Sequence, residues 1–263
     1  MTRYVTCDVK GPAQENYGLG NQLFCIATTL AYSKKHNIKY ALPQLKEASH
    51  GNYINNIFSK LETNFDIVER LNFIKIQETG FEYTQLPFYE NYSILLDGYF
   101  QSEKYFIDYR DYIIKNLNLI DIKKNLSNKY SNLDKFTSLH IRRGDYLNKQ
   151  QYHNILNLQY YKNALKLINN ENILIFSDDI EWCKQNLNFI NNKIFATNQY
   201  DYEDLILMSM CKNNIIANSS FSWWGAWLNE NTNKLVVAPK EWFGPAYSQM
   251  LTNDLIPESW NRI

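Results

Sequence analysis

Apolar and polar residues follow two alternating patterns from residue 136 onward. Short runs rich in Ile, Leu and Val predict strands at 136–142, 172–177, 193–197, 214–218 and 234–239. The stretches between these runs repeat their apolar residues at helical spacing and predict helices near 160–168, 180–187, 202–210 and 220–228. Strands that alternate with helices form right-handed parallel crossovers. We therefore predict an open α/β sheet with its ligand beyond the carboxyl ends of the strands.

The first part of the chain opens with a similar pattern. An apolar strand at 4–9, a glycine-bearing loop, a helix at 21–36 and a strand at 38–42 predict a strand–helix–strand unit. Helical periodicity returns at 105–117. Residues 49–91 have a mixed pattern that predicts no particular element.

A polar segment separates the first part of the chain from the part that begins at residue 136. Asn, Ser, Lys and Asp break the apolar pattern at 125–134. We predict a domain boundary there, so that residues 1–130 and 131–263 form two Rossmann-like α/β domains facing a central cleft.

Composition narrows the class of protein. The chain has 263 residues, of which 45% are hydrophobic, so it can bury a core. Its 27 basic and 27 acidic residues cancel, and no overall field draws it to nucleic acid. Cys7, Cys25, Cys183 and Cys211 lack the spacing of a zinc site, and we interpret them as reduced, mostly buried thiols. With no secretory signal or membrane-length apolar run apparent, we expect a cytoplasmic protein.

The segment His-Ile-Arg-Arg-Gly-Asp at 140–145 follows a predicted strand. Because side chains alternate along a strand, His140 and Arg142 share the face opposite the apolar residues. An arginine at the end of such a strand suits a pyrophosphate, since its planar fork donates two charge-assisted hydrogen bonds. The alternative is a surface ion pair between Arg143 and Asp145 beside a core histidine.

A second segment, Ala-Asn-Ser-Ser-Phe-Ser-Trp-Trp-Gly-Ala-Trp at 217–227, joins a predicted strand to a helix. Exposed amides at a helix start, beside serine hydroxyls, form an anion site. The alternative is that Ser219 or Ser220 simply caps the helix. For Trp223 and Trp227, spaced by one helical turn, we favour packing in the core.

Two weaker signals accompany these segments. An aspartate after the strand at 172–177, either Asp178 or Asp179, presents two acceptors that can select guanine, or it caps the next helix. The Gly-Leu-Gly-Asn-Gln run at 18–22 lets backbone approach a bulky ligand but lacks the third glycine of a dinucleotide site. No Asp-x-Asp tripeptide occurs in the chain, which argues against a divalent cation on the pyrophosphate.

Together these motifs resemble those of the α-1,2-fucosyltransferases of glycosyltransferase family 11. The resemblance covers most of the chain in the same order, and it includes the segments 96–106 and 203–211. It implies a GT-B-like fold in which residues 131–263 bind GDP-fucose and residues 1–130 lie on the acceptor side. Tyr17 stands where the family usually has a second glycine, and Cys25 stands where glutamine is common.

The resemblance also implies roles for single residues. Arg142 is similar to the arginine that binds the β-phosphate of the donor, with Arg143 supporting the loop through Asp145. The donor-binding set implied by the resemblance is Gly18, Gly20, Asn21, His140, Arg142, Asp178, Ser219, Ser220 and Phe221. The implied catalytic residues are Arg142, Asp145 and Asn21, and Asp145 is the first carboxylate to consider as a base.

The implied reaction is an inverting, metal-independent transfer of L-fucose from GDP-β-L-fucose to the 2-hydroxyl of a terminal β-galactoside. No cofactor is expected. The expected partners are GDP-fucose and a galactoside-containing oligosaccharide or lipid-linked glycan, with peripheral membrane contact left open. The alternatives are a GDP-fucose-dependent transferase with a different acceptor or linkage, and a non-catalytic protein that binds a GDP-sugar or a glycan.

Overall fold

The computed structural model describes residues 2–9, 18–43, 53–170 and 172–263. The chain divides into two compact units, each with its own parallel sheet. The first unit comprises Met1–Leu119 with Leu251–Pro257, and the second comprises Ile120–Met250 with Glu258–Ile263. The α/β class predicted from the sequence is confirmed.

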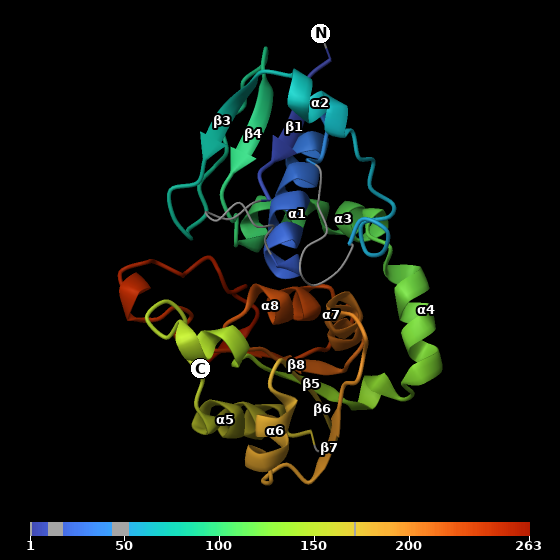
Figure 1. The fold of residues 1–263 in the computed structure, drawn as a ribbon, viewed down its shortest axis with the longest axis vertical. Coiled ribbons are helices and arrows are strands. Elements are labelled where there is room, and N and C mark those ends of the chain that lie inside the picture. The colour runs from blue at the N-terminus through green and yellow to red at the C-terminus, as the bar shows by residue number, and fades with distance from the viewer. Residues whose placement is uncertain (1, 10–17, 44–52, 171) are drawn as a thin grey trace. The chain divides into compact units, whose positions relative to one another are not determined.

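The first unit contains a four-stranded parallel sheet in the order β2-β1-β4-β3 (Figure 1). Its strands are β1 (Tyr4–Cys7), β2 (Lys39–Tyr40), β3 (Phe73–Gln77) and β4 (Ser93–Asp97). The chain passes from β1 through α1 to β2, and later returns to the other side of β1 with β4. The sequence pattern predicts β1 and β2 but neither β3 nor β4.

The helices of the first unit are α1 (Leu19–His36), α2 (Phe65–Arg70) and α3 (Arg110–Asn116), with 3-10 turns η1 (Glu103–Tyr105) and η2 (Ile107–Tyr109). α1 is buried on nearly all sides, as its largely apolar sequence requires. The predicted helix at 105–117 is only partly correct. Phe106, whose ring is buried, leaves helical geometry with φ of −147°, so the regular helix begins at Arg110.

The second unit contains a six-stranded parallel sheet in the order β10-β9-β8-β5-β6-β7. Its strands are β5 (Thr137–Ile141), β6 (Asn172–Ser177), β7 (Asn192–Phe195), β8 (Asn213–Ile215), β9 (Val236–Ala238) and β10 (Asn261–Arg262). From β5 the chain moves outward to β6 and β7, then returns to the opposite side of β5 with β8. The direction of winding therefore switches between β5 and β8, the place where open α/β sheets bind ligands.

Helices cover both faces of this second sheet (Figure 1). The helices of this part of the chain are α4 (Leu119–Lys129), α5 (Leu158–Ile168), α6 (Ile180–Asn186), α7 (Asp201–Ser209) and α8 (Ser220–Trp227), with 3-10 turns η3 (Leu133–Lys135), η4 (Gly144–Asn148) and η5 (Pro245–Tyr247). α5 and α6 lie on one face of the sheet, and α7 and α8 lie on the other. α4 continues to Lys129, across part of the segment that the sequence predicts as a domain boundary.

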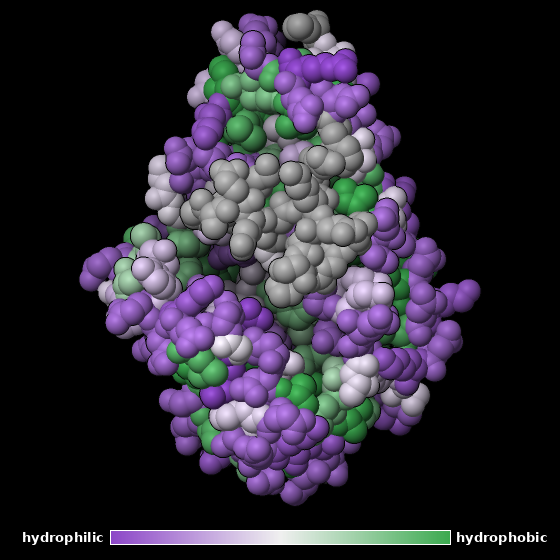
Figure 2. Space-filling model, viewed as in Figure 1, coloured by the Kyte–Doolittle hydropathy of each residue, from purple (hydrophilic) through white to green (hydrophobic). Residues whose placement is uncertain are grey.

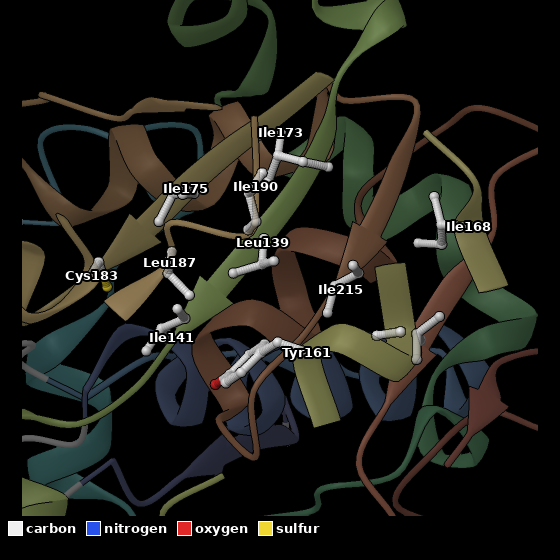
Figure 3. Packing of buried hydrophobic residues seen from close by; sticks show 12 residues of the cluster. Leu139, Ile141, Tyr161, Ile168, Ile173, Ile175, Cys183, Leu187, Ile190 and Ile215 are labelled. Atoms are coloured by element: carbon white, nitrogen blue, oxygen red, sulfur yellow. The ribbon is translucent and has the colours of Figure 1, made fainter. Parts of the chain in front are cut away.

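One face of β5 supplies the core beneath α5 and α6. Figure 3 shows Leu139 and Ile141 of β5 clustered with Ile173 and Ile175 of β6 and with Tyr161 of α5. All five are at most 1% exposed. This burial confirms the prediction that Leu139 and Ile141 share the apolar face of the strand.

The other face of β5 carries polar side chains, as predicted. The Nδ2 of Asn214 donates to the Oγ of Ser138 at 2.7 Å. The ring of His140 lies 5.6 Å from that of Phe221, in the first turn of α8. This face therefore leads from the strand to the start of a helix.

Tryptophans and a glycine fix α8 against its surroundings. Trp223 and Trp224 are fully buried, and Trp223 contacts Trp260 at a ring distance of 5.4 Å. A Cβ atom at Gly225 would lie 2.8 Å from the Cβ of Met208 in α7, so only glycine allows this close approach. The favoured core role of the tryptophans is confirmed.

Most of the described surface on the face drawn in Figure 2 is hydrophilic. Among the described residues, no helix combines the length and the apolar character needed to cross a membrane. All four cysteines are free and buried, as predicted.

Candidate functional site

The candidate site of the second unit lies at the carboxyl ends of three neighbouring strands. In the parallel pairing of β5 with β6, Ile141 lies opposite Ser177. β8 flanks β5 on its other side and leads into α8. The side chains that follow these strands therefore gather around the switch point between β5 and β8.

Arg142 directly follows β5, and two carboxylates hold its guanidinium. Nη2 lies 2.7 Å from Oδ1 of Asp145, and Nη1 lies 3.0 Å from Oδ2 of Asp178. The guanidinium also lies 5.3 Å from the centre of the Tyr146 ring. Its side chain is 34% exposed, so the charge is fixed in direction yet accessible to a ligand.

Asp178 uses one oxygen to bind Arg142 and the other to bind the turn that follows it. The backbone N–H of Arg143 donates to Oδ1 at 2.9 Å, and Oδ2 pairs with Arg142. A Cβ atom at Gly144 would lie 2.5 Å from Oδ2, so glycine is needed for this approach. A guanine edge would have to share oxygens that already have partners, and the donor role of Asp178 stays a prediction.

Arg143 does not support the loop through Asp145, and that prediction is wrong. Its Nε lies 3.2 Å from Oδ2 of Asp179, and its guanidinium stacks 4.0 Å from the centre of the Trp182 ring. Both partners belong to the start of α6, which is close in space but distant in sequence. Asp179 also caps α6, because its Oδ1 accepts from the N–H of Trp182 at 3.2 Å.

Asp145 is more exposed than Asp178, with 43% of its side chain accessible compared with 24%. It pairs with Arg142, and the Nζ of Lys149 lies 3.4 Å from its Oδ2. Partial burial alone would raise the pKa of Asp145, but the two cations outweigh burial and hold it below its usual range. Asp145 is therefore an ionised, poorly basic carboxylate.

His140 is 4% exposed, and its Nδ1 is buried without a hydrogen-bond partner among the described residues. Burial, assisted by the charge of Arg142, lowers the pKa of His140 to about 3. The ring is therefore neutral near pH 7 and can offer a ligand a hydrogen bond but no charge.

The start of α8 differs from an ordinary capped helix. Ser219 occupies the N-cap position, but its hydroxyl makes no capping hydrogen bond within the described structure. Instead, the Oγ of Ser222, within the helix, accepts from the N–H of Ala217, before the helix, at 3.2 Å. This bond stabilises the turn between β8 and α8. Ser220 and Phe221 are partly exposed at this end, where helix amides favour an anion.

Asn218 and Tyr146 join these segments, although the sequence gives neither a role. The hydroxyl of Tyr146 donates to the carbonyl of Asn218 at 3.1 Å. The Nδ2 of Asn218 donates to the carbonyls of Asn154 and Trp242, at 2.9 and 3.0 Å. Asn218 lies inside the segment 217–227 and Tyr146 directly follows the segment 140–145, and these positions are the only signal that the sequence offers.

The remaining candidates lie in the first unit. Gly18 is the N-cap of α1, Gly20 is buried in its first turn, and Asn21 is partly exposed. The Nε2 of Gln101 donates to Oδ1 of Asn21 at 2.8 Å. Tyr17 lies outside the described residues. These residues and the second-unit set belong to different compact units, and their shared role in donor binding stays a prediction.

Comparisons with known proteins agree on family and fold. The family model described as glycosyl transferase family 11 matches residues 17–263. An Escherichia coli protein named alpha-1,2-colitosyltransferase is 34% identical over 282 residues, covering 94% of this chain and 96% of that protein. The Escherichia coli O-antigen biosynthesis glycosyltransferase WbnK is 38% identical over 179 residues, covering 60% of this chain and 58% of that protein.

A solved structure gives the same architecture. The α-1,6-fucosyltransferase NodZ, soaked with GDP-fucose, matches with a TM-score of 0.57 at 12% identity, covering 87% of this chain and 93% of that one. A second structure of NodZ, from Bradyrhizobium, has a TM-score of 0.55 at 13% identity, with 86% and 93% coverage. The predicted GT-B-like fold is confirmed.

Replacing His140 by Gln should flatten the acid side of the stability profile. An unfolded histidine binds a proton below about pH 6.5, whereas folded His140 does so only near its pKa of about 3. Between these values the unfolded state binds more protons. Wild-type stability should therefore fall as the pH decreases from about 6.5, by up to about 1.4 kcal/mol per pH unit from this group.

Urea unfolding at several pH values between about 7 and about 5 measures this slope. His140→Gln should remove this contribution, whereas His36→Gln, at a partly exposed histidine of the first unit, should leave most of the slope in place. An unchanged slope in His140→Gln would mean that the folded ring accepts a proton after all.

Proposed function

Because the chain belongs to glycosyltransferase family 11, we propose that it transfers L-fucose from GDP-β-L-fucose to the 2-hydroxyl of a terminal β-galactoside. The product is an α-1,2-fucosylated glycan, formed with inversion by a single in-line displacement. The motifs shared with α-1,2-fucosyltransferases support the donor, and the relative named alpha-1,2-colitosyltransferase supports the linkage. A fucosyltransferase soaked with GDP-fucose has the same fold.

The observation that carries this proposal is the placement of Arg142. An arginine has five N–H groups, and the two carboxylate contacts of Arg142 leave others free to meet a ligand. A diphosphate at the end of β5 would receive them as charge-assisted hydrogen bonds. As the bond to fucose breaks, negative charge grows on the diphosphate, and a guanidinium already fixed in direction stabilises it without reorganising.

The amides at the start of α8 extend the same positive site. They follow β8, the strand beside β5 at the switch point, and Phe221 of this turn contacts His140. Neutral His140 adds hydrogen-bonding capacity without repelling or attracting the diphosphate. In this proposal, Arg142 and the helix amides replace the divalent cation that other transferases use.

A second candidate donor is GDP-colitose, because one relative carries the name alpha-1,2-colitosyltransferase. Colitose is fucose without its 3-hydroxyl, so both donors offer the same diphosphate and the same anomeric centre. Contacts to that single hydroxyl would decide between them, since a site built to bind a hydroxyl strongly rejects the analogue that lacks it.

Incubation of the purified chain with lactose and either donor in excess EDTA tests the proposal. We expect an α-1,2-linked product on the galactose, identified by NMR, and the donor with the higher kcat/KM is the physiological class. Lactose lacking the galactose 2-hydroxyl is the matched control and should give no product. Tight binding of GDP without GDP release for any galactoside would favour a non-catalytic binding protein, and a product with another linkage would change the assigned acceptor position.

Arg142→Ala should lower kcat about 100- to 1000-fold, the usual effect of removing one group that stabilises transition-state charge. The neighbouring Arg143→Ala is the matched control, because its guanidinium is bound to Asp179 and Trp182. The control should lower stability more than turnover. Near-normal kcat in Arg142→Ala would contradict the role of Arg142.

Asp145→Asn should keep kcat within about tenfold of wild type. General-base catalysis contributes about 10² to 10⁴ and works best with a pKa near the working pH, whereas Arg142 and Lys149 hold the pKa of Asp145 below its usual range despite partial burial. A glycosidic bond that breaks early needs little help from a base. Initial rates of GDP release measure the effect, and a loss above about 100-fold would identify Asp145 as the base.

A further inference from the structure

Glu78 lies at the edge of the first sheet where β3 and β4 end. In their parallel pairing Gln77 lies opposite Asp97, so Glu78 and Gly98 leave the sheet side by side. The backbone N–H of Glu78 continues the pairing by donating to the carbonyl of Asp97 at 2.9 Å. A Cβ atom at Gly98 would lie 2.4 Å from the Cβ of Glu78, so glycine is required for this approach.

The carboxylate of Glu78 holds the loop that follows β4. Its Oε2 accepts from the backbone N–H of Tyr99 at 2.7 Å and from that of Phe100 at 2.8 Å. One side-chain oxygen therefore fixes two successive peptide groups of a loop outside the sheet.

This loop has a conformation that its sequence does not favour. Phe100 has φ of 51°, in the left-handed region that residues other than glycine rarely adopt. Its ring is fully buried and packs edge-on against Tyr105 at 5.3 Å. Ring packing and the two hydrogen bonds to Glu78 hold the backbone in this turn.

The turn directs the next side chain inward. Gln101 is 8% exposed, and its Nε2 donates to Oδ1 of Asn21 at 2.8 Å. Because Gln101 donates to Oδ1 of Asn21, it fixes the orientation of the amide, and Nδ2 is the donor that Asn21 can present to a ligand. A donor of this kind suits the oxygens of a phosphate or a sugar hydroxyl.

We propose that Glu78 is a positioning residue for the transfer reaction, acting through the Phe100 turn and Gln101 to orient the Asn21 amide. The role of Asn21 at the donor rests on the function proposed above. Glu78 itself touches neither substrate nor reacting atoms, and its contribution is to keep the loop in the one conformation that delivers Gln101 to Asn21.

The electrostatics of Glu78 indicate which substitution preserves this role. Burial raises the pKa of Glu78 to about 7, while the N–H groups of Phe100 and Tyr99 and the Tyr105 hydroxyl oppose the rise. The carboxyl group keeps an acceptor oxygen in either protonation state. Glutamine has the same shape and also keeps one carbonyl acceptor, whereas alanine removes it.

The test combines kinetics with a double-mutant cycle. Glu78→Ala should lower kcat/KM for the donor about 10- to 100-fold, the scale expected from misplacing a binding group, and Glu78→Gln should recover most of that loss. In an Asn21→Ala background, Glu78→Ala should cause little further loss, since the two residues act through one contact. Asp204→Ala, which removes a partly buried carboxylate of the second unit, is the control, and any loss of activity that it causes should be the same in both backgrounds.

Two measurements do not require turnover and separate this proposal from the proposed function. Hydrogen exchange of the amides at 99–102 should accelerate in Glu78→Ala and stay slow in Glu78→Gln. The side-chain NH₂ resonance of Asn21 should shift in Glu78→Ala. If the wild type were inactive while Glu78→Ala still showed faster exchange and the shifted Asn21 resonance, only the proposed fucosyl transfer would be refuted. If Glu78→Ala lowered kcat/KM equally in the wild-type and Asn21→Ala backgrounds, or left hydrogen exchange at 99–102 unchanged, the role of Glu78 would be overturned.

Discussion

The pairing of Arg142 with Asp145 and Asp178 is the interaction on which the second-unit site depends. A cation at the ends of strands loses part of its hydration, and carboxylates at 2.7 and 3.0 Å compensate for that loss. The same contacts explain the requirement for glycine at 144 and the weak basicity of Asp145. One fixed charge therefore sets both the shape and the electrostatics of the strand-end turn.

The second sheet could be predicted because β5, β6 and β9 lie in apolar runs and the strands alternate in most cases with one helix. In the first sheet, β1 and β2 could be predicted as well, but β3 resisted prediction for a physical reason. β3 is largely solvent-accessible, with one buried position in five residues, and α2 has only six residues. Such short elements contain too few repeats for a period to emerge, and tertiary pairing with β4 rather than local pattern stabilises β3.

The residues of the site that directly follow strands could be predicted, since parallel strands bring their carboxyl ends to one edge of the sheet. Arg142 and Asp178 meet for that reason. Beyond the strand end, side-chain direction decides the contacts, and Arg143 reaches Asp179 rather than nearby Asp145. Glu78 has no motif around it, and its contact with the Phe100 backbone depends on the register of β3 with β4.

The close packing of α8 has an evolutionary consequence. Gly225 against Met208, and Trp223 against Trp260, leave the helix no space to slide or tilt. Under the proposed function, a change of donor sugar is therefore reached more easily by substitutions in the surrounding loops than by moving the helix, because interior jigsaw packing tolerates few changes of volume. If α8 binds the diphosphate as proposed, the part that all nucleoside diphosphate sugars share lies on the rigid helix, and the contacts that distinguish one sugar from another lie outside it.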